Sequence, residues 1–281
     1  MTQTLTLGHS PDPDDAFMFY ALAKGRIETG DLRFEHVLQD IETLNQRARR
    51  GELDVTALSV HAYAYVADRY ALLPCGASVG ERYGPLVVAR APMSPDDLRR
   101  RRVAVPGTLT TAFLALRLAV GEFPYVVLPF DQILSAVAAG EADAGLIIHE
   151  GQLTYPQQAL EKVADLGEWW FGETGLPLPL GVNGVRKDLG PALMERIARI
   201  VRQSIDYGLA HRAEAVRHAL GYARDMDEAL ADRFVGMYVN AYTVDLGERG
   251  RRAIAELLDR AKRANLIPSP VVCEFVGEAA G

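Results

Sequence analysis

The sequence has few of the features that mark the commonest functional classes. Its two cysteines, Cys75 and Cys273, lie far apart and outside any CxxC or Cys/His spacing, so neither a disulfide framework nor a zinc site is indicated. Lys and Arg number 30 against 37 Asp and Glu, a formal charge of −7. Proteins that bind nucleic acid need a basic face to neutralise phosphates, so we expect no nucleic-acid partner. The four arginines from Arg99 to Arg102 are interpreted as an exposed helix end and loop.

Long hydrophobic runs are also missing. No stretch approaches the roughly 20 apolar residues that a membrane helix needs, so no membrane partner is expected. The opening MTQTLTLGHSPDPDD lacks the basic and apolar regions of a signal peptide, which predicts a cytoplasmic protein. A phosphate loop, a Rossmann glycine fingerprint, a nucleophile elbow and an HExxH motif are all absent from the sequence. These absences exclude the commonest cofactor-dependent and hydrolytic classes.

What the sequence does contain is a strand and helix alternation that occurs twice. With 281 residues, 49% of them apolar, it is long enough for one large domain or two modest ones. Each block alternates strands and helices and therefore predicts a parallel sheet with helices on its faces. The first block has strands at 4–9, 32–38 and 54–59 with helices from about 16 to 25, after Asp40 to Gly51, and at 61–68. The second has strands at 103–106, 125–128 and 144–148 with helices at 110–120 and 131–139.

Two proline-containing segments, residues 84–90 and 176–182, separate the second block from the rest of the chain. The residue before a proline avoids the helical region, so both segments are predicted to be extended connectors that form a hinge crossed twice. Residues 191–265 are almost entirely helical by periodicity, and we expect them to pack onto the first lobe. The predicted fold class is therefore α/β with two lobes: a larger lobe of residues 1–88 and 179–281, a smaller lobe of residues 89–178, and a central ligand cleft between them.

Polar residues follow several predicted strands, and in parallel α/β sheets that edge is where ligands bind. Ser10 and Asp12 lie in the turn after the first strand, which is also rich enough in Asp and Pro to be an ordinary connection. Ser59 ends the third strand, and Asn45 lies on the preceding helix; either is also explained by capping or solvation. Both interpretations stay open for each pair at this stage.

A stronger anion-binding pattern follows the strand at 103–106. Gly107 precedes Thr110, Thr111 and Ala112 at a predicted helix start. Backbone N–H groups there lack helical partners and the helix dipole is positive, an arrangement that favours a carboxylate or phosphate. A helix cap alone needs one threonine, so the hydroxyl-rich turn favours anion binding over capping alone.

The continuous apolar run from Ala144 to Ile148 predicts a buried strand that delivers His149 and Glu150 at its carboxyl end. Imidazole titrates near neutral pH, which suits a general base, and the position favours that role over a structural one. Glu150 either orients the imidazole or caps the next turn. His9, at the end of the first strand, is the rival for the base role.

With these residues identified, the chain resembles the 1,4-dihydroxy-6-naphthoate synthase family of the futalosine route to menaquinone. Several blocks carry the resemblance in the same order along nearly the whole chain. They are Ser10 to Asp15 with Phe17 and Phe19 to Leu22, Asp40 to Asn45, Leu58 with Ser59, Pro85 to Arg90, Val103 to Gly107 with Thr110 to Ala112, Ala144 to Glu150, Thr154 to Pro156, and Leu176 to Gly181.

The resemblance implies a type II periplasmic-binding-protein-like fold used by a cytoplasmic lyase. It implies cleavage of cyclic dehypoxanthine futalosine into 1,4-dihydroxy-6-naphthoate and a three-carbon fragment, without a metal or organic cofactor. It further implies that His149 is the base and that Asn45, Ser59, Thr111 and Ala112 line the pocket. Proton removal followed by cleavage driven by aromatisation needs one base and good positioning, which agrees with the residues present.

One departure and two alternatives accompany this expectation. The family often opens Ser-Pro-Cys-Pro-Asn-Asp, whereas this chain has Asp12 and Asp14 at the third and fifth positions. Two added carboxylates repel an anionic substrate unless they point away, bind hydroxyls or are protonated.

The alternatives are a sister lyase resembling chorismate dehydratase, and a solute-binding protein without catalytic activity. The expected partner is a small anionic molecule, and a homodimer is among the oligomeric states left open.

Overall fold

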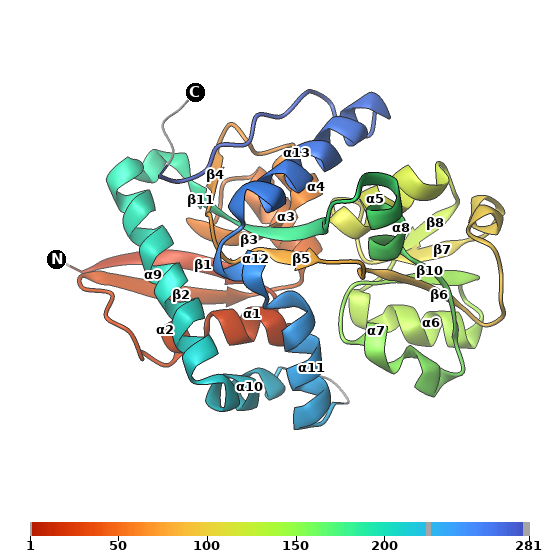
Figure 1. Cartoon of the computed structure of the whole chain (residues 1–281), viewed down its shortest axis with the longest axis horizontal. Helices are drawn as coiled ribbons and strands as arrows, with labels where there is room; N and C mark the ends of the chain where they lie inside the picture. The colour runs from red at the N-terminus through yellow and green to blue at the C-terminus, as the bar shows by residue number, and fades with distance from the viewer. Residues whose placement is uncertain (1, 223–225, 278–281) are drawn as a thin grey trace.

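The computed structural model describes residues 2–222 and 226–277 and contains two β-sheets arranged side by side (Figure 1). In those residues the first sheet has the strand order β2-β1-β3-β11-β4, with β5 paired to β11, and the second has the order β10-β6-β9-β7-β8. The first-sheet strands are β1 Gln3–His9, β2 Leu32–Leu38, β3 Val55–Ser59, β4 Tyr70–Leu72, β5 Ser78–Gly80 and β11 Leu178–Arg186. The second-sheet strands are β6 Leu86–Ala89, β7 Val103–Val105, β8 Tyr125–Val127, β9 Ala144–Ile147 and β10 Glu161–Asp165.

The predicted strands and helices of the two blocks are present, with changes at some ends. The block helices are α1 Pro13–Met18, α2 Tyr20–Ala23, α3 Ile41–Arg49, α4 Val60–Tyr63, α5 Thr111–Val120, α6 Ile133–Ala139, α7 Gly151–Thr154 and α8 Leu166–Thr174. The predicted helix from about 16 to 25 is wrong in its start and continuity. It begins at Pro13, whose fixed φ suits a first helical position, and breaks at Phe19. The predicted helix at 61–68 is too long. Only α4, Val60–Tyr63, is helical, and residues 64–69 form turns.

The prediction of purely parallel sheets is wrong for both lobes. Strands β1, β2 and β3 are parallel, as are β7, β8 and β9. However, β11 runs antiparallel to β3, β4 and β5, and β6 runs antiparallel to β9 and β10. The reason is that both segments interpreted as connectors contain strands. An extended backbone with free N–H and C=O groups pairs with an adjacent strand wherever it enters a sheet.

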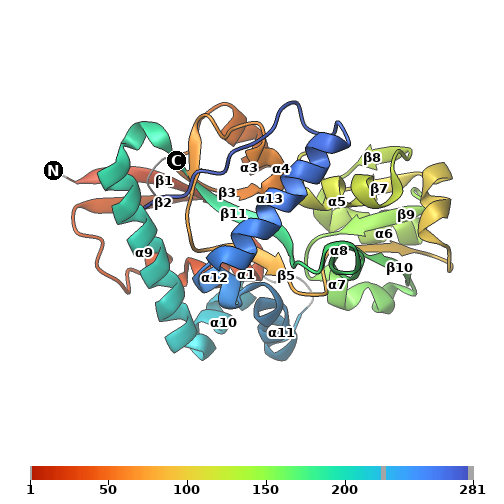
Figure 2. The same cartoon turned by 45° about the horizontal axis from the view of Figure 1, so that its top comes forward.

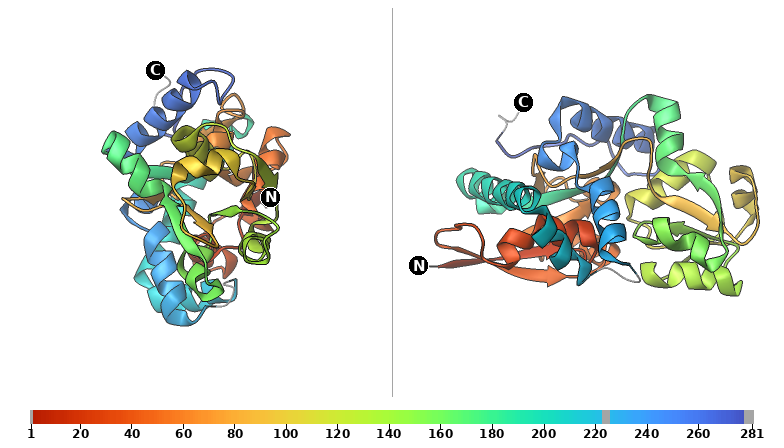
Figure 3. Two further views of the ribbon diagram at one scale, coloured as in Figure 1. Left: turned by 90° about the vertical axis from the view of Figure 1, so that its right-hand side faces the viewer. Right: turned by 60° about the horizontal axis from the view of Figure 1, so that its bottom comes forward.

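The positions of these two strands locate the crossings between the sheets. The chain leaves the first sheet after β5 and enters the second at β6; it leaves the second after β10 and re-enters the first at β11. The predicted division at residues 88 and 89 therefore falls inside β6, and that at 178 and 179 falls at the start of β11. The extent of each lobe stays a prediction. Figure 3 (right) shows the two-lobed arrangement from another direction.

The C-terminal helices are α9 Pro191–Ala210, α10 Arg212–Leu220, α11 Glu228–Tyr238, α12 Ala241–Val244 and α13 Gly247–Arg263. As expected, α9, α10 and α11 pack onto α1 and α2 of the first lobe, although residues 223–225 of the predicted helical region lie outside the described residues. Helix α13 differs because it lies across the middle of the molecule, over α4 and against α5 (Figure 2). No helix among the described residues is long and apolar enough to cross a membrane.

One apolar core extends across both sheets. It includes Leu58 of β3, Leu146 of β9 and Leu257 of α13, all fully buried. Trp170 of α8 is fully buried in the same cluster and donates its indole N–H to the Pro177 carbonyl at 3.0 Å. Because this core is shared, the lobes pack closely on the α13 side of the cleft.

Candidate active site

A cavity of about 720 Å³, counting the part open to solvent, lies at the carboxyl ends of strands from both sheets. Its walls come mainly from the β1–α1 turn, the end of β3, the start of α5, residue 148 after β9, and β11, with further residues from α3, the β4–β5 segment, the segment before β6 and α11. Of the predicted substrate-binding residues, those that line it are Ser10, Asp12, Ser59, Thr110, Thr111 and Ala112. Asn45, Gly107 and His149 are not among the residues that line it.

Asn45 supports Ser59 from behind. The Asn45 amide nitrogen donates to Ser59 Oγ at 2.9 Å, and the Ser59 backbone N–H donates to the Asn45 side-chain oxygen at 2.9 Å. Asn45 has no exposed surface. Because Ser59 Oγ already accepts a hydrogen bond, its own O–H is left to donate into the cavity. Asn45 therefore orients Ser59.

The start of α5 has the geometry of a capped helix with free N–H groups. The Thr110 hydroxyl accepts from the Phe113 N–H at 3.1 Å and donates to the Gly107 carbonyl at 2.9 Å. The Thr111 hydroxyl donates to the Leu180 carbonyl of β11 at 2.6 Å. Both hydroxyls are thus used within the protein, so an anion at this position binds through backbone N–H groups of the first turn and the helix dipole.

Gly107 has a structural reason to be glycine. A Cβ at this position would lie 2.3 Å from the Glu42 carboxylate, which packs over the turn from α3. Glu42 accepts the Leu109 N–H at 3.0 Å and thereby joins α3 to the turn before α5. Glu42 could not be predicted from the sequence, because its contact joins residues 67 positions apart and no local pattern indicates it.

Burial favours the protonated form of the two additional carboxyl groups, Asp12 and Asp14. Burial, together with the neighbouring Asp14 and Glu150, raises the pKa of Asp12 to about 8, and His149 acts in the opposite direction. Burial also raises the pKa of Asp14 and Asp15, and Asp15 accepts the Ser10 N–H at 2.7 Å. A neutral Asp12 does not repel an anion and donates one hydrogen bond, so the repulsion expected from the sequence is relieved by protonation.

His149 follows β9 and is 6% exposed. Its Nε2–H donates to the Phe130 carbonyl at 2.9 Å, and its Nδ1 accepts the Gly151 N–H at 3.0 Å. A Glu150 carboxylate oxygen lies 3.5 Å from Nδ1. Both ring nitrogens therefore have protein partners, although His149 is near enough to Asp12 to lower the pKa of that cavity-lining carboxyl.

His9 has different surroundings. Its Nδ1–H donates to the Ser10 carbonyl and its Nε2 accepts from His36 Nδ1, each at 3.0 Å. It lines a smaller cavity with His36 and His218. Burial lowers the pKa of His9 to about 4. It is not among the residues around the main cavity.

Several lining residues were not predicted. Asn183 of β11 lies just beyond the segment 176–182 that was interpreted as a connector, and Tyr238 of α11 belongs to the region interpreted as packing helices. The Tyr238 hydroxyl donates to the Gln152 side chain at 2.8 Å and so joins the first lobe to α7 of the second. Among the described residues, no group of three or more His, Cys, Asp or Glu side chains is arranged to hold a metal ion.

The comparisons with known proteins agree with this architecture. The sequence pattern of a family described as menaquinone biosynthesis matches residues 5–263. A 1,4-dihydroxy-6-naphthoate synthase from Thermus thermophilus is 47% identical over 269 residues, covering 95% of this chain and 98% of its own. A second, from Streptomyces coelicolor, is 43% identical over 274 residues and covers 95% of each chain.

Solved structures extend the comparison. A protein from Archaeoglobus fulgidus has a TM-score of 0.90 at 47% identity, covering 94% of this chain and 98% of that one. The alkanesulfonate-binding protein of Xanthomonas axonopodis has a TM-score of 0.73 at 17% identity over 96% of each chain, which supports the periplasmic-binding-protein-like fold alone. The chain belongs to the 1,4-dihydroxy-6-naphthoate synthase family, whose members are enzymes of menaquinone biosynthesis.

Proposed function

We propose that this protein is a carbon–carbon lyase that converts cyclic dehypoxanthine futalosine to 1,4-dihydroxy-6-naphthoate and a three-carbon fragment. The observation that carries the proposal is the cavity between the lobes. The start of α5, where an anion can bind, and the hydrogen-bond donors Ser59 and Asp12 line the same cavity. The full-length similarity to two synthases supports the same activity. A cytoplasmic location and a small anionic substrate follow as parts of the proposal.

The substrate carboxylate binds at the start of α5. Thr111 and Ala112 line the cavity there, and their backbone N–H groups belong to the first helical turn. The Ser59 hydroxyl and the protonated Asp12 carboxyl lie elsewhere in the cavity wall and donate to substrate oxygens. In this proposal the negative end of the substrate lies at the start of α5, and its hydroxyl-bearing end lies against the β1–α1 turn.

His149 is the proposed general base. It needs a free lone pair, and in the structure the Nδ1 lone pair accepts the Gly151 N–H. Substrate binding therefore has to release Nδ1 from Gly151, while Nε2–H keeps its bond to Phe130 and fixes the tautomer. His149 then takes a proton from the sugar-derived part of the substrate, the carbon–carbon bond breaks, and its electrons complete the aromatic ring.

The test is to incubate the purified protein with cyclic dehypoxanthine futalosine and to follow the dihydroxynaphthoate product by absorbance and mass. Product formation supports the proposal. Turnover of chorismate instead would assign the sister dehydratase-like activity. Tight binding of either compound without product would assign a solute-binding role.

A further inference from the structure

A second cavity lies beside the start of α5 and is separate from the main one. It measures about 600 Å³, counting the part open to solvent. Its walls come from α3 and α4 of the first lobe, from the turn before α5 and α5 itself, and from the segment after α13. The residues that matter for its chemistry are Arg49, His61, Tyr65, Phe113, Arg117 and Leu266.

His61 supplies an acceptor at the buried end of this cavity. The residue is 5% exposed, and its Nδ1 lies 3.3 Å from the Thr110 carbonyl, which requires the proton on Nδ1. Burial lowers the pKa of His61 to about 4, so the ring is neutral at pH 7. Its Nε2 is buried and has no hydrogen-bond partner within 3.5 Å, and a backbone contact with Leu266 opposes part of the fall in the pKa of the ring. An unpaired buried lone pair is unfavourable, and a ligand O–H placed there satisfies it.

Two arginines supply positive charge. The Arg117 guanidinium makes one hydrogen bond to Glu122 at 2.9 Å, while its Nε is buried without a partner. Arg49 lies with its guanidinium 5.7 Å from the Tyr65 ring centroid. No carboxylate is among the cavity-lining residues in the described part of the chain. Guanidinium groups in this setting favour a carboxylate.

The walls between these ends are aromatic. Tyr65 lies on the first-lobe side and Phe113 on α5, and the Arg117 guanidinium is 5.9 Å from the Phe113 ring. Flat apolar walls of this kind favour an aromatic ring system. The three features define one ligand: a hydroxyl donor, a flat aromatic body and a carboxylate.

We propose that this cavity is a second ligand site for a hydroxylated aromatic carboxylate. The product of the proposed reaction belongs to this chemical class, so the suggestion that the product itself binds rests on the proposed function. The site itself rests on His61 and the two arginines.

Occupancy of this site affects the main cavity. The His61 backbone N–H donates to Thr111 Oγ1 at 3.2 Å, and its ring contacts the Thr110 carbonyl. Both threonines line the main cavity. A ligand held by α3 and α4 on one side and by α5 on the other stabilises this arrangement. We therefore expect it to slow opening of the lobes and product release.

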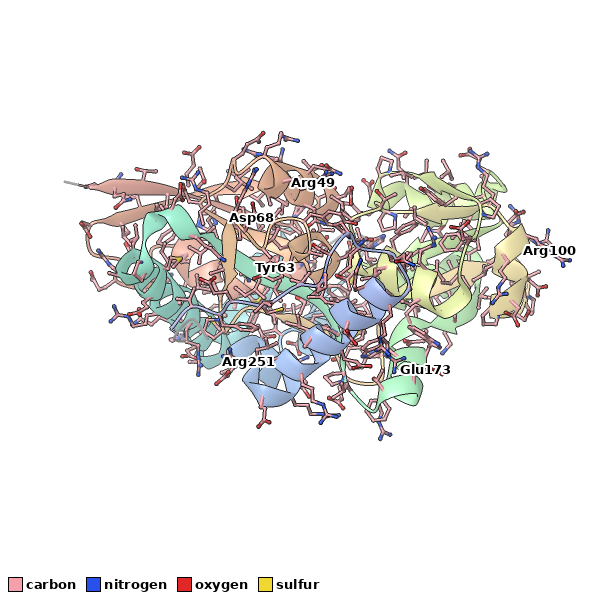
Figure 4. All side chains as sticks on the ribbon, turned by 90° about the horizontal axis from the view of Figure 1, so that it is seen from above. Arg49, Tyr63, Asp68, Arg100, Glu173 and Arg251 are labelled. Atoms are coloured by element: carbon pink, nitrogen blue, oxygen red, sulfur yellow. The ribbon has the colours of Figure 1, made fainter. Side chains whose placement is uncertain are left out.

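The test uses 6-hydroxy-2-naphthoate as the probe, titrated by calorimetry into the full chain without substrate. Arg117→Gln should weaken binding at one site by roughly tenfold or more, since it removes a charge-assisted hydrogen bond. Arg100→Gln is the matched control, because it removes the same charge at the far end of the second lobe from Arg49 (Figure 4). A third arm compares the probe with 2-naphthoate on wild type and on His61→Phe.

The expected result is weaker binding in Arg117→Gln, unchanged binding in Arg100→Gln, and a preference for the hydroxylated probe that His61→Phe abolishes. Equal affinity in Arg117→Gln and wild type would overturn the site. So would weakening by Ser59→Ala alone, because the probe then occupies the main cavity. These binding measurements need no turnover, so their failure is distinct from failure of the lyase proposal.

Discussion

The two histidines that follow buried strands differ in what surrounds them. His9, at the end of β1, pairs with His36 and faces a small cavity shared with His218. His149, after β9, lies beside Glu150, is near enough to Asp12 to affect its pKa, and directly follows Ile148 of the main-cavity wall. The sequence favours His149 over His9 as the base, although each comes at the carboxyl end of a predicted strand. The difference shows that the neighbouring charges and the cavity, more than the strand end, separate a candidate base from a structural histidine.

Replacing each histidine separately tests whether His149 and His9 differ in function. His149→Ala should lower kcat by about 10²–10⁴, the usual contribution of a general base, while the fold is kept. His9→Ala should leave kcat per folded molecule within roughly threefold, because it removes buried packing and not a reacting group. Turnover by product absorbance and folded fraction by circular dichroism measure both. The reverse pattern would move the base role to His9.

Asp12 links the two regions, since it follows β1 and its pKa responds to Glu150 and His149. With a pKa of about 8, it is neutral at pH 7 and negative at pH 9. The negative form repels an anionic substrate, so KM for wild type should rise on the order of tenfold between pH 7 and pH 9. Asp12→Asn should remove this rise.

Stability gives a second measurement of the same group. The pKa of Asp12 is higher in the folded protein than its usual value of 3.8, so folding takes up a proton and stability falls as pH rises from about 4 to about 8. Asp12→Asn should therefore raise Tm at pH 8. Asp68→Asn, a change at an exposed carboxylate, is the control and should alter neither Tm nor KM. A wild-type KM that stays flat up to pH 9 would contradict the protonated state.

The sequence predicted the starts of α3 and α5 well because local capping patterns encode them. Thr110 caps α5 and Asp40 caps α3, each with a hydrogen bond to the N–H three residues on. It did not predict strands β6 and β11, since whether an extended segment pairs depends on a partner far away in the chain. Glu42 over Gly107 and the Tyr238 contact to Gln152 were missed for the same reason.

Glu150→Gln tests whether the carboxylate beside His149 assists proton transfer. The Glu150 carboxylate lies 3.5 Å from Nδ1 and favours the protonated imidazole that forms during proton transfer. Its removal should lower kcat by about tenfold and shift the ionisation in the pH–rate profile to lower pH. A structural role alone would change Tm and leave the shape of that profile unaltered. The profile of kcat against pH therefore decides the role of Glu150.

His36→Gln tests the His9 side and has the smallest expected effect on turnover. Burial lowers the pKa of His9 and His36 to about 4, below the ordinary value of 6.5. Their contribution to stability is therefore fully present above pH 6.5 and is lost as pH falls towards 4, at on the order of 1–2 kcal/mol per histidine by pH 5. A glutamine can still donate to His9 Nε2 but does not titrate, so His36→Gln should lose less stability than wild type between pH 7 and pH 5. Thermal unfolding at both pH values measures this difference.

The same variant should leave kcat at pH 7 within about twofold of wild type, because neither His9 nor His36 lines the main cavity. A large fall in kcat would show that His9 and His36 contribute to catalysis and would contradict the functional difference between His9 and His149.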